Sequence, residues 1–146
     1  MRIGELAKQA GCPVETVRYY EREGLLPPAA RQAGNDYREY GPMHLERLVF
    51  IRRCRALEMS QQEIRELLQA RDQPDASCAC INDLIDKHLV HVSARLAELQ
   101  ALQVQLGELR SQCVSAHTIR DCGILQGLAQ HEELPALKPV GRMCQE

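Results

Sequence analysis

The sequence predicts an all-α protein with one small two-stranded β element. Its 146 residues are 45% hydrophobic but only 3% aromatic, with no Trp and a single Phe. A core built from Leu, Ile, Val, Ala and Met favours helices over strands. Apolar residues also recur at helical spacing along most of the chain. This length holds one ordinary domain, or a small domain with an extension.

Two short helices joined by a tight turn are predicted at the start of the chain. Apolar residues at helical spacing begin at Ile3 and end at Gly11. A second helix follows at once, with Pro13 suited to its first position, and runs to Gly24. Two short helices with a Gly-containing turn between them predict a helix-turn-helix.

A small wing is predicted after the second helix. Residues 27–41 are rich in turn formers, yet Tyr37, Arg38 and Tyr40 stand in near alternation. Alternating residues between turn formers indicate two short paired strands.

Two further helices are predicted beyond the wing. Helical periodicity resumes over 44–57 and again over 61–68. Ser60 is suited to cap the second of these, and Glu63, three residues later, completes a capping box. Residues 72–77 predict a linker.

The strongest pattern lies over residues 81–112. Apolar residues recur every seven positions, and two more fall on a companion position: Ile85, Val92, Leu99 and Leu106, then Leu102 and Leu109. This heptad stripe predicts a long helix that pairs with another helix. His88 and Arg95 occupy the companion position nearer the start, where the stripe is weaker.

The chain divides by charge as well as by pattern. Its net charge of −2 splits into +2 over the first 71 residues and −4 over the rest, and all four Tyr lie in the first 40 residues. The predicted parts are a winged helix-turn-helix over 1–71, a coiled-coil dimerisation helix over 81–112, a metal-binding loop and short helix over 113–131, and a flexible tail over 132–146.

The seven cysteines, an odd number, indicate a metal-binding or redox role rather than a framework of disulfides. No apolar stretch approaches the length of a membrane span and no export signal appears, so we expect a cytoplasmic chain without membrane contact. In a reducing compartment, many cysteines indicate metal ligation or redox chemistry.

The spacing of Cys78 and Cys113 indicates an antiparallel dimer. They bracket the heptad stripe 35 residues apart, which is roughly 52 Å along a straight helix, too far to share an ion within one chain. If two such helices pack antiparallel about a twofold axis, Cys78 of one chain meets Cys113 of the other. Cys122 can fold back to complete each of two equivalent sites.

Three thiolates favour soft or borderline metals over magnesium or calcium. Cys80 or His117 could supply a further ligand. The alternative is that Cys78 and Cys113 are small apolar fillers. Cys12 and Cys54 are interpreted as packing residues, and Cys144 as an idle thiol in the tail.

Arg and Tyr side chains on the front part suit phosphate and groove contact with duplex DNA. The candidate DNA-binding residues are Thr16, Arg18, Tyr19 and Tyr20 on the second helix, Arg31, Asn35, Tyr37 and Arg38 on the wing, and Arg55 beyond it. The alternative for Tyr19, Tyr20 or Tyr40 is packing of the wing against the helices.

Several motifs resemble one family. Residues 3–7 (IGELA), 14–21 (VETVRYYE), 24–27 (GLLP), 37–40 (YREY) and 51–55 (IRRCR) resemble the DNA-binding half of the MerR family of bacterial transcription regulators. Cys78, Cys113 and residues 122–128 (CGILQGL) resemble its lead- and cadmium-responsive branch, the PbrR- and CadR-like regulators. In the wing, Asp36 and Glu39 depart from the usual pattern.

The resemblance implies a homodimeric regulator that binds double-stranded promoter DNA. Metal binding would distort the DNA so that RNA polymerase initiates at a metal-resistance promoter. Pb(II) or Cd(II) is the favoured ion, with Hg(II) and Zn(II) behind. A thiol redox switch and a metal-buffering protein are the other candidates; no pattern typical of an enzyme appears.

Overall fold

The computed structural model describes residues 1–31, 33–34, 36–116 and 118–130. One compact unit spans Met1–Ile81, and a second begins at Asn82. The predicted tail over 132–146 lies outside the described residues, as do Asn35, His117 and Cys144. The all-α prediction is confirmed, because helices dominate and the sheet has only two short strands.

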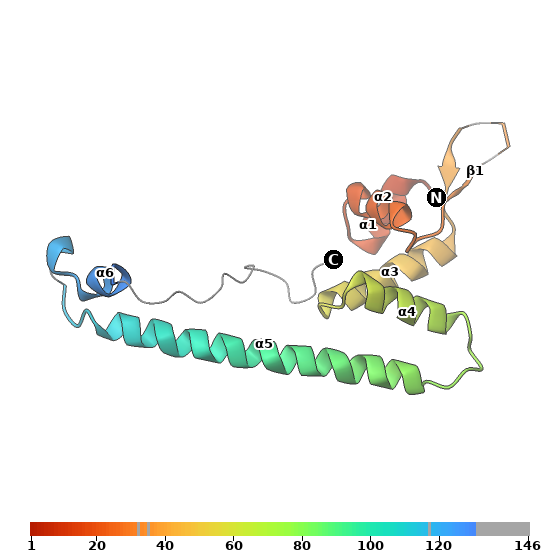
Figure 1. Cartoon of the computed structure of the whole chain (residues 1–146). Coiled ribbons are helices and arrows are strands. Elements are labelled where there is room, and N and C mark those ends of the chain that lie inside the picture. Colours follow the sequence, from red (N-terminus) through yellow and green to blue (C-terminus); the bar gives the residue numbers. More distant parts are fainter. Residues whose placement is uncertain (32, 35, 117, 131–146) are drawn as a thin grey trace. The chain divides into compact units, whose positions relative to one another are not determined.

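The predicted helix-turn-helix is confirmed (Figure 1). Helix α1 (Ile3–Ala10) ends at Gly11, whose φ of 69° is left-handed and whose N–H donates to carbonyl groups of the last turn. Helix α2 (Val14–Arg22) begins one residue later than predicted, because Pro13 is extended, with ψ of 152°. The glycine at 11 thus lets the chain reverse without steric cost.

The wing is confirmed in a shorter form than the alternation indicated. Strand β1 (Ala30–Arg31) pairs antiparallel with β2 (Arg38–Glu39), with Arg31 opposite Arg38. At the base of the wing, the Tyr40 N–H donates to the Met1 carbonyl oxygen and the N-terminal amine donates to the Tyr40 carbonyl oxygen, both at 2.8 Å. The first residue of the chain is therefore fastened to the wing.

The two predicted helices beyond the wing are present and slightly longer. Helix α3 (Pro42–Ala56) begins two residues before the prediction. Helix α4 (Gln61–Arg71) has the predicted capping box: the Ser60 Oγ accepts from the Glu63 N–H at 3.1 Å, and the Glu63 carboxylate accepts from the Ser60 N–H at 3.0 Å.

The core of the first unit is aliphatic, as the composition predicts. Its fully buried side chains, besides that of Tyr40, are Leu6, Val17, Leu25, Leu26, Leu48, Ile51, Ile64 and Leu68. Arginines on α3 fasten this core to neighbouring turns: the Arg47 guanidinium donates to the Leu25 carbonyl oxygen at 2.6 Å, and that of Arg52 donates to the Ala10 carbonyl oxygen. The helices that carry the wing are thus held by both packing and side-chain hydrogen bonds.

Helix α5 (Ala79–Ser111) is one continuous helix of 33 residues. Along its heptad stripe the side chains of Val92, Leu99 and Leu106 are 41%, 47% and 57% exposed in the single chain. Beyond it a single-turn helix, η1 (Ile119–Asp121), leads into α6 (Gly123–Leu128), which lies at the end of α5 (Figure 1). Within the described part of the chain, we find no helix with the length and apolarity needed to cross a membrane.

Candidate metal centre and nucleic-acid interface

The structure brings Cys113 and Cys122 together at the end of α5. Cys113 follows the last turn, where its carbonyl oxygen accepts a hydrogen bond of 2.6 Å from the Arg110 guanidinium. Its sulfur lies 3.4 Å from the Ser115 carbonyl oxygen. The chain then returns through η1 to Cys122, the N-cap residue of α6, whose sulfur is within hydrogen-bonding reach of the Cys113 thiol. Two half-buried thiols from separate segments therefore form a pair.

The local backbone favours the charged form of Cys122. Hydrogen bonds from the backbone N–H groups of Leu125 and then Ile124 lower the pKa of the Cys122 thiol below its ordinary value, while partial desolvation opposes them. The hydrogen bond from Cys113 acts in the same direction as the backbone. A lowered pKa reduces the competition between a proton and a metal ion for this sulfur.

The other two candidate thiols lie at the opposite end of α5. Cys78 and Cys80 are both exposed, and the Ala79 N–H between them donates to the Ser77 hydroxyl oxygen at 3.2 Å. A helix of 33 residues is about 50 Å long. Among the described residues of this single chain, no three His, Cys, Asp or Glu side chains form a group that could hold a metal ion.

The interpretation of Cys12 and Cys54 as packing residues agrees with their burial. Cys54 is only 6% exposed, and Cys12 is half-buried. Desolvation raises the pKa of both thiols, although Arg52 opposes it at Cys12 and Arg71 at Cys54. Thiols that stay protonated are poor metal ligands and poor nucleophiles.

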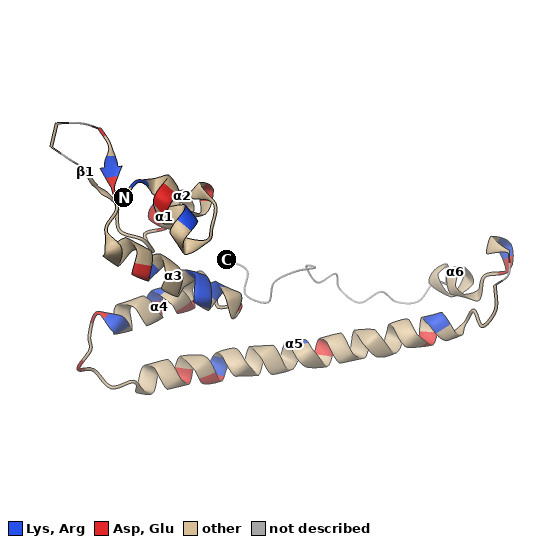
Figure 2. Cartoon of the chain, turned by 180° about the vertical axis from the view of Figure 1, so that it is seen from behind, with Lys and Arg blue, Asp and Glu red and all other residues tan. Residues whose placement is uncertain are grey.

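A basic cleft of about 450 Å³ lies between the N-terminus, α2 and the wing. It is lined by Arg2, Ile3, Arg18, Tyr37, Arg38 and Tyr40. The Arg2 guanidinium lies 4.4 Å from the centre of the Tyr37 ring, so the cation and the ring stack. Two of the arginines form ion pairs with carboxylates: Arg18 lies 3.3 Å from Glu15, and Arg38 lies 3.4 Å from Glu21. Figure 2 shows basic and acidic residues interspersed over the helices and wing of this unit.

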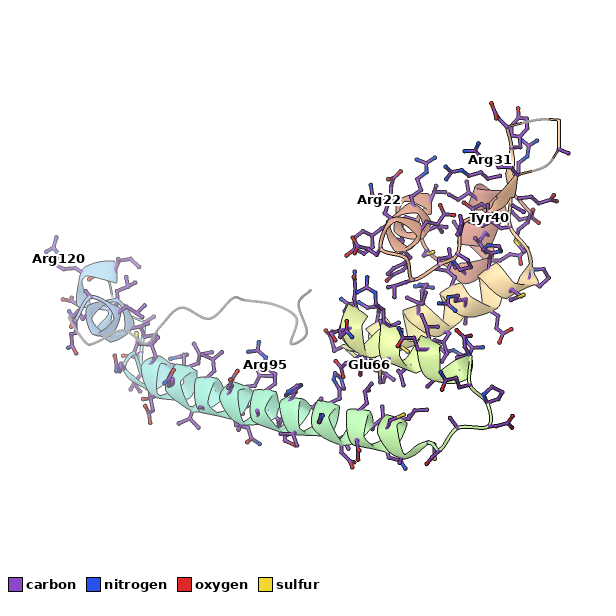
Figure 3. The ribbon with its side chains drawn as sticks, turned by 45° about the vertical axis from the view of Figure 1, so that its right-hand side comes forward. Arg22, Arg31, Tyr40, Glu66, Arg95 and Arg120 are labelled. Carbon is purple, nitrogen blue, oxygen red and sulfur yellow. The ribbon has the colours of Figure 1, made fainter. Side chains whose placement is uncertain are left out.

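The remaining candidate DNA-binding residues differ in exposure. Arg31 is exposed on the wing (Figure 3), whereas Thr16 and Tyr19 are half-buried on α2. The Tyr19 hydroxyl accepts a hydrogen bond from the Gln61 amide. Tyr20 is only 7% exposed and belongs mainly to the core. Arg55 is half-buried on α3 and donates to the Met59 carbonyl oxygen at 2.6 Å.

One contact in this interface was not anticipated from the sequence, and one expected packing role is assigned to a particular tyrosine. Arg2 lies in the cleft through its stacking on Tyr37, 35 residues away in the chain, and no local pattern signals that contact. Tyr40, 1% exposed, donates from its hydroxyl to the Glu21 carboxylate at 2.5 Å. The expectation that one of the tyrosines packs the wing against the helices is thus confirmed for Tyr40 (Figure 3).

Comparison with known proteins agrees with this geometry. A family model described as MerR HTH family regulatory protein matches residues 1–71, and one described as MerR, DNA binding, matches residues 45–109. A relative from Haemophilus influenzae, the HTH-type transcriptional regulator ZntR homolog, is 47% identical over 115 residues, which are 79% of this chain and 84% of that protein. The chain belongs to the MerR family.

Other MerR-family regulators are similar over nearly the whole chain. The HTH-type transcriptional regulator ZntR of Escherichia coli (strain K12) is 40% identical over 131 residues, 88% of this chain and 92% of that one. The crystal structure of the transcription regulator PbrR691 from Ralstonia metallidurans CH34 in complex with lead(II) aligns with a TM-score of 0.78 and 54% identity, covering 88% of this chain and 99% of that chain. This MerR-family chain is a DNA-binding transcriptional regulator and not an enzyme.

Proposed function

We propose that this metal-responsive MerR-family regulator is switched by a soft divalent ion held between two chains. Cys113 and Cys122 of one chain and Cys78 of its partner would be the ligands. The observation that carries the proposal is the pairing of the Cys113 and Cys122 sulfurs at the end of a helix whose start carries Cys78. Cys80 or His117 is a candidate for a further ligand.

The chemistry of the paired thiols supports a soft ion. Thiolates favour soft and borderline ions, and the lowered pKa of Cys122 increases the thiolate fraction at neutral pH. Pb(II) comes first, because the chain is 54% identical to a regulator solved with lead(II). Cd(II) follows, and Hg(II) and Zn(II) are alternatives that accept the same sulfurs.

The exposed heptad stripe of α5 supports an antiparallel homodimer. Val92, Leu99 and Leu106 are each about half exposed in the single chain, and a stripe of this kind is buried by pairing with a second helix. With the two helices antiparallel, the start of each lies beside the end of the other, so Cys78 approaches the partner's thiol pair. The twofold axis makes two equivalent sites.

The first unit supports recognition of promoter DNA. In this proposal residues 1–71 bind the DNA. Residues 81–112 form the dimer contact, and residues 113–131 form the metal-binding loop and short helix. Arg18, Tyr37 and Arg38 line a basic cleft suited to a phosphate. With its two copies on the two halves of a promoter, the metal-bound dimer would distort the DNA so that RNA polymerase initiates at a metal-resistance promoter. Binding to promoter DNA in this way implies the cytoplasm.

A mixed dimer tests the shared site. One chain carries Cys78→Ser, and its partner carries Cys113→Ser and Cys122→Ser. We expect one Pb(II) per mixed dimer in equilibrium dialysis, because the intact Cys78 and the intact thiol pair meet only across the interface. Each variant as a homodimer is the control and should lack the site. No bound Pb(II) in the mixed dimer would refute the cross-subunit arrangement.

A thiol redox switch is the second candidate, and the same pair of sulfurs favours it. Two neighbouring thiols, one with a lowered pKa, are suited to form a disulfide on oxidation. Thiol titration of the metal-free protein before and after peroxide separates the candidates. A metal sensor keeps transcription unchanged by peroxide, whereas a redox sensor changes transcription as Cys113 and Cys122 are lost from the titration.

A further inference from the structure

Two glycines in α6 face a single residue at the end of α5. Gly123 and Gly127 are four residues apart, so they lie on one face of the helix. A Cβ added to Gly123 would overlap the main-chain carbonyl oxygen of Gln112, and one added to Gly127 would overlap the Gln112 side-chain oxygen. Gln112 is the residue that directly precedes Cys113, and Gly123 directly follows Cys122.

Lack of room for a side chain, rather than an unusual backbone conformation, explains why these two residues are glycines. Gly11, Gly24 and Gly34 have positive φ, but Gly123 and Gly127 do not. Inside a helix each glycine costs about 0.5–1 kcal/mol relative to alanine. Two of them in a helix of six residues are therefore explained by the close approach to Gln112.

We infer that Gly123, supported by Gly127 and Gln112, is a positioning residue that sets the separation of Cys113 and Cys122. Gln112 is the chain neighbour of Cys113 and Gly123 is the chain neighbour of Cys122, so a shift of α6 away from α5 moves the sulfurs apart. The inference rests on the proposed function, since it assigns these residues to the metal site without contact to the ion.

The hydrogen bonds within the segment after Cys113 differ from the glycine contacts, because they do not reach the end of α5. The Gln126 amide donates to the Arg120 carbonyl oxygen at 3.3 Å, and the Thr118 hydroxyl donates to the Asp121 carboxylate at 3.1 Å. Both join residues within 118–128, so they maintain the shape of this segment alone. The glycine contacts instead join this segment to the residue beside Cys113.

The two contacts predict graded effects of substitution by alanine. At Gly123 the obstacle is main chain, which cannot move without shifting the end of α5. At Gly127 the obstacle is the far end of a flexible side chain, which can swing away. Gly107, whose added Cβ would meet nothing within 4 Å, is the matched control on the same unit.

Pb(II) binding by the full-length dimer measures these effects. Gly123→Ala should weaken binding by about tenfold or more and reduce the near-ultraviolet thiolate-to-lead absorption per ion, because one sulfur is displaced. Gly127→Ala should have a smaller effect, and adding Gln112→Ala to it should restore wild-type binding. Adding Gln112→Ala to Gly123→Ala should restore nothing, since the carbonyl oxygen remains. Gly107→Ala should bind as the wild type does.

A second measurement separates this inference from the proposed function. In metal-free protein, mild oxidation followed by mass spectrometry gives the rate at which the Cys113–Cys122 disulfide forms, and Gly123→Ala should slow it by about tenfold or more if α6 is displaced. Wild-type protein that binds none of Pb(II), Cd(II), Hg(II) and Zn(II) would refute the proposed function and leave this rate as the test. Gly123→Ala with wild-type disulfide formation, or with the Pb(II) affinity and spectrum of Gly107→Ala, would overturn the inference.

Metal-free binding to promoter DNA serves as the folding check for each variant. If Gly123→Ala fails to fold, Gly127→Ala is compared with and without Gln112→Ala. Restored Pb(II) binding in the double variant supports the contact. A Gly127→Ala defect that Gln112→Ala does not restore overturns it. In that case a Gly127→Ala protein that binds Pb(II) as Gly107→Ala does would also overturn the inference.

Discussion

The Tyr40 hydroxyl group is one of the contacts that join the wing to α2. The Tyr40 hydroxyl donates to the Glu21 carboxylate at 2.5 Å, and the same carboxylate lies 3.4 Å from the Arg38 guanidinium. The Tyr40 ring also meets His44 edge-on, with centres 5.2 Å apart. This side chain, directly after β2, therefore connects the end of the wing to α2 and α3.

Replacing the tyrosine by phenylalanine tests this connection. Tyr40→Phe should lower the free energy of unfolding by about 1–2 kcal/mol, because the Glu21 carboxylate loses a buried donor. Urea unfolding at pH 7 measures the change, with Tyr37→Phe, at an exposed residue, as the control. Equal stability of the two variants would show that the Tyr40 hydrogen bond contributes nothing.

The same group predicts a loss of stability in alkali. Burial, and then the hydrogen bond and charge of Glu21, raise the pKa of Tyr40 to about 12 from an ordinary value of 10.0. The folded state then holds a proton that the unfolded state releases, so the contribution of Tyr40 is complete below about pH 10 and disappears as the pH rises to about 12. Tyr40→Phe should lack this part of the alkaline transition.

At the scale of the elements, the turn after α3 contains a residue whose conformation and burial are both unfavourable. Glu58 follows the helix with φ of 62°, a left-handed conformation that favours glycine. Its Oε2 atom is buried and has no hydrogen-bond partner among the residues that the structure describes. Both features destabilise the turn between α3 and α4.

Glu58→Gly should therefore stabilise the protein. We expect the free energy of unfolding to rise by about 1 kcal/mol, since glycine adopts positive φ freely and brings no carboxylate. Glu58→Ala removes the carboxylate but keeps the left-handed conformation unfavourable, so it should gain less. A lower melting temperature for Glu58→Gly than for wild type would contradict this interpretation.

Helix α5 predicts a clear difference between its faces. Leu99, on the heptad stripe, and Val104, off it, are 47% and 60% exposed in the single chain. Leu99→Asp should weaken dimerisation by at least about a hundredfold, because it places two carboxylates in an apolar contact. Val104→Asp should leave the dimer intact. Sedimentation equilibrium measures both, and equal effects would argue against pairing through the stripe.

At the scale of the whole molecule, the modest +2 charge of the first 71 residues makes DNA affinity depend on two copies and on well-placed cations. Arg2 is one of these, since it stacks on Tyr37 in the basic cleft. If each copy of Arg2 contacts one phosphate, Arg2→Ala should reduce the slope of log affinity against log salt by about two per dimer.

The control for that measurement is Lys87→Ala. Lys87 is an exposed cation on α5 that lies two residues past Ile85, away from both heptad positions. Its loss should leave the salt dependence unchanged. A slope that is the same for Arg2→Ala and wild type would remove Arg2 from the DNA contact.

The sequence by itself determined the features that depend on neighbouring residues. The capping box of Ser60 and Glu63, the turn at Gly11 and the extent of α5 follow from spacings of a few residues, because helix geometry repeats over that distance. The heptad positions likewise predict which face of α5 pairs with a second helix. Wing residues were predicted less well, since strands of two residues carry almost no periodic signal.

Only the tertiary structure decided which distant residues touch. The stacking of Arg2 on Tyr37, the bond from Tyr40 to Glu21, and the approach of Gly123 to Gln112 each join segments whose sequences do not indicate one another. Burial of Tyr20 and exposure of Arg18 were settled in the same way. The physical reason is that packing depends on the summed shape of many side chains, whereas a cap or a heptad depends on the regular rise and rotation of one helix.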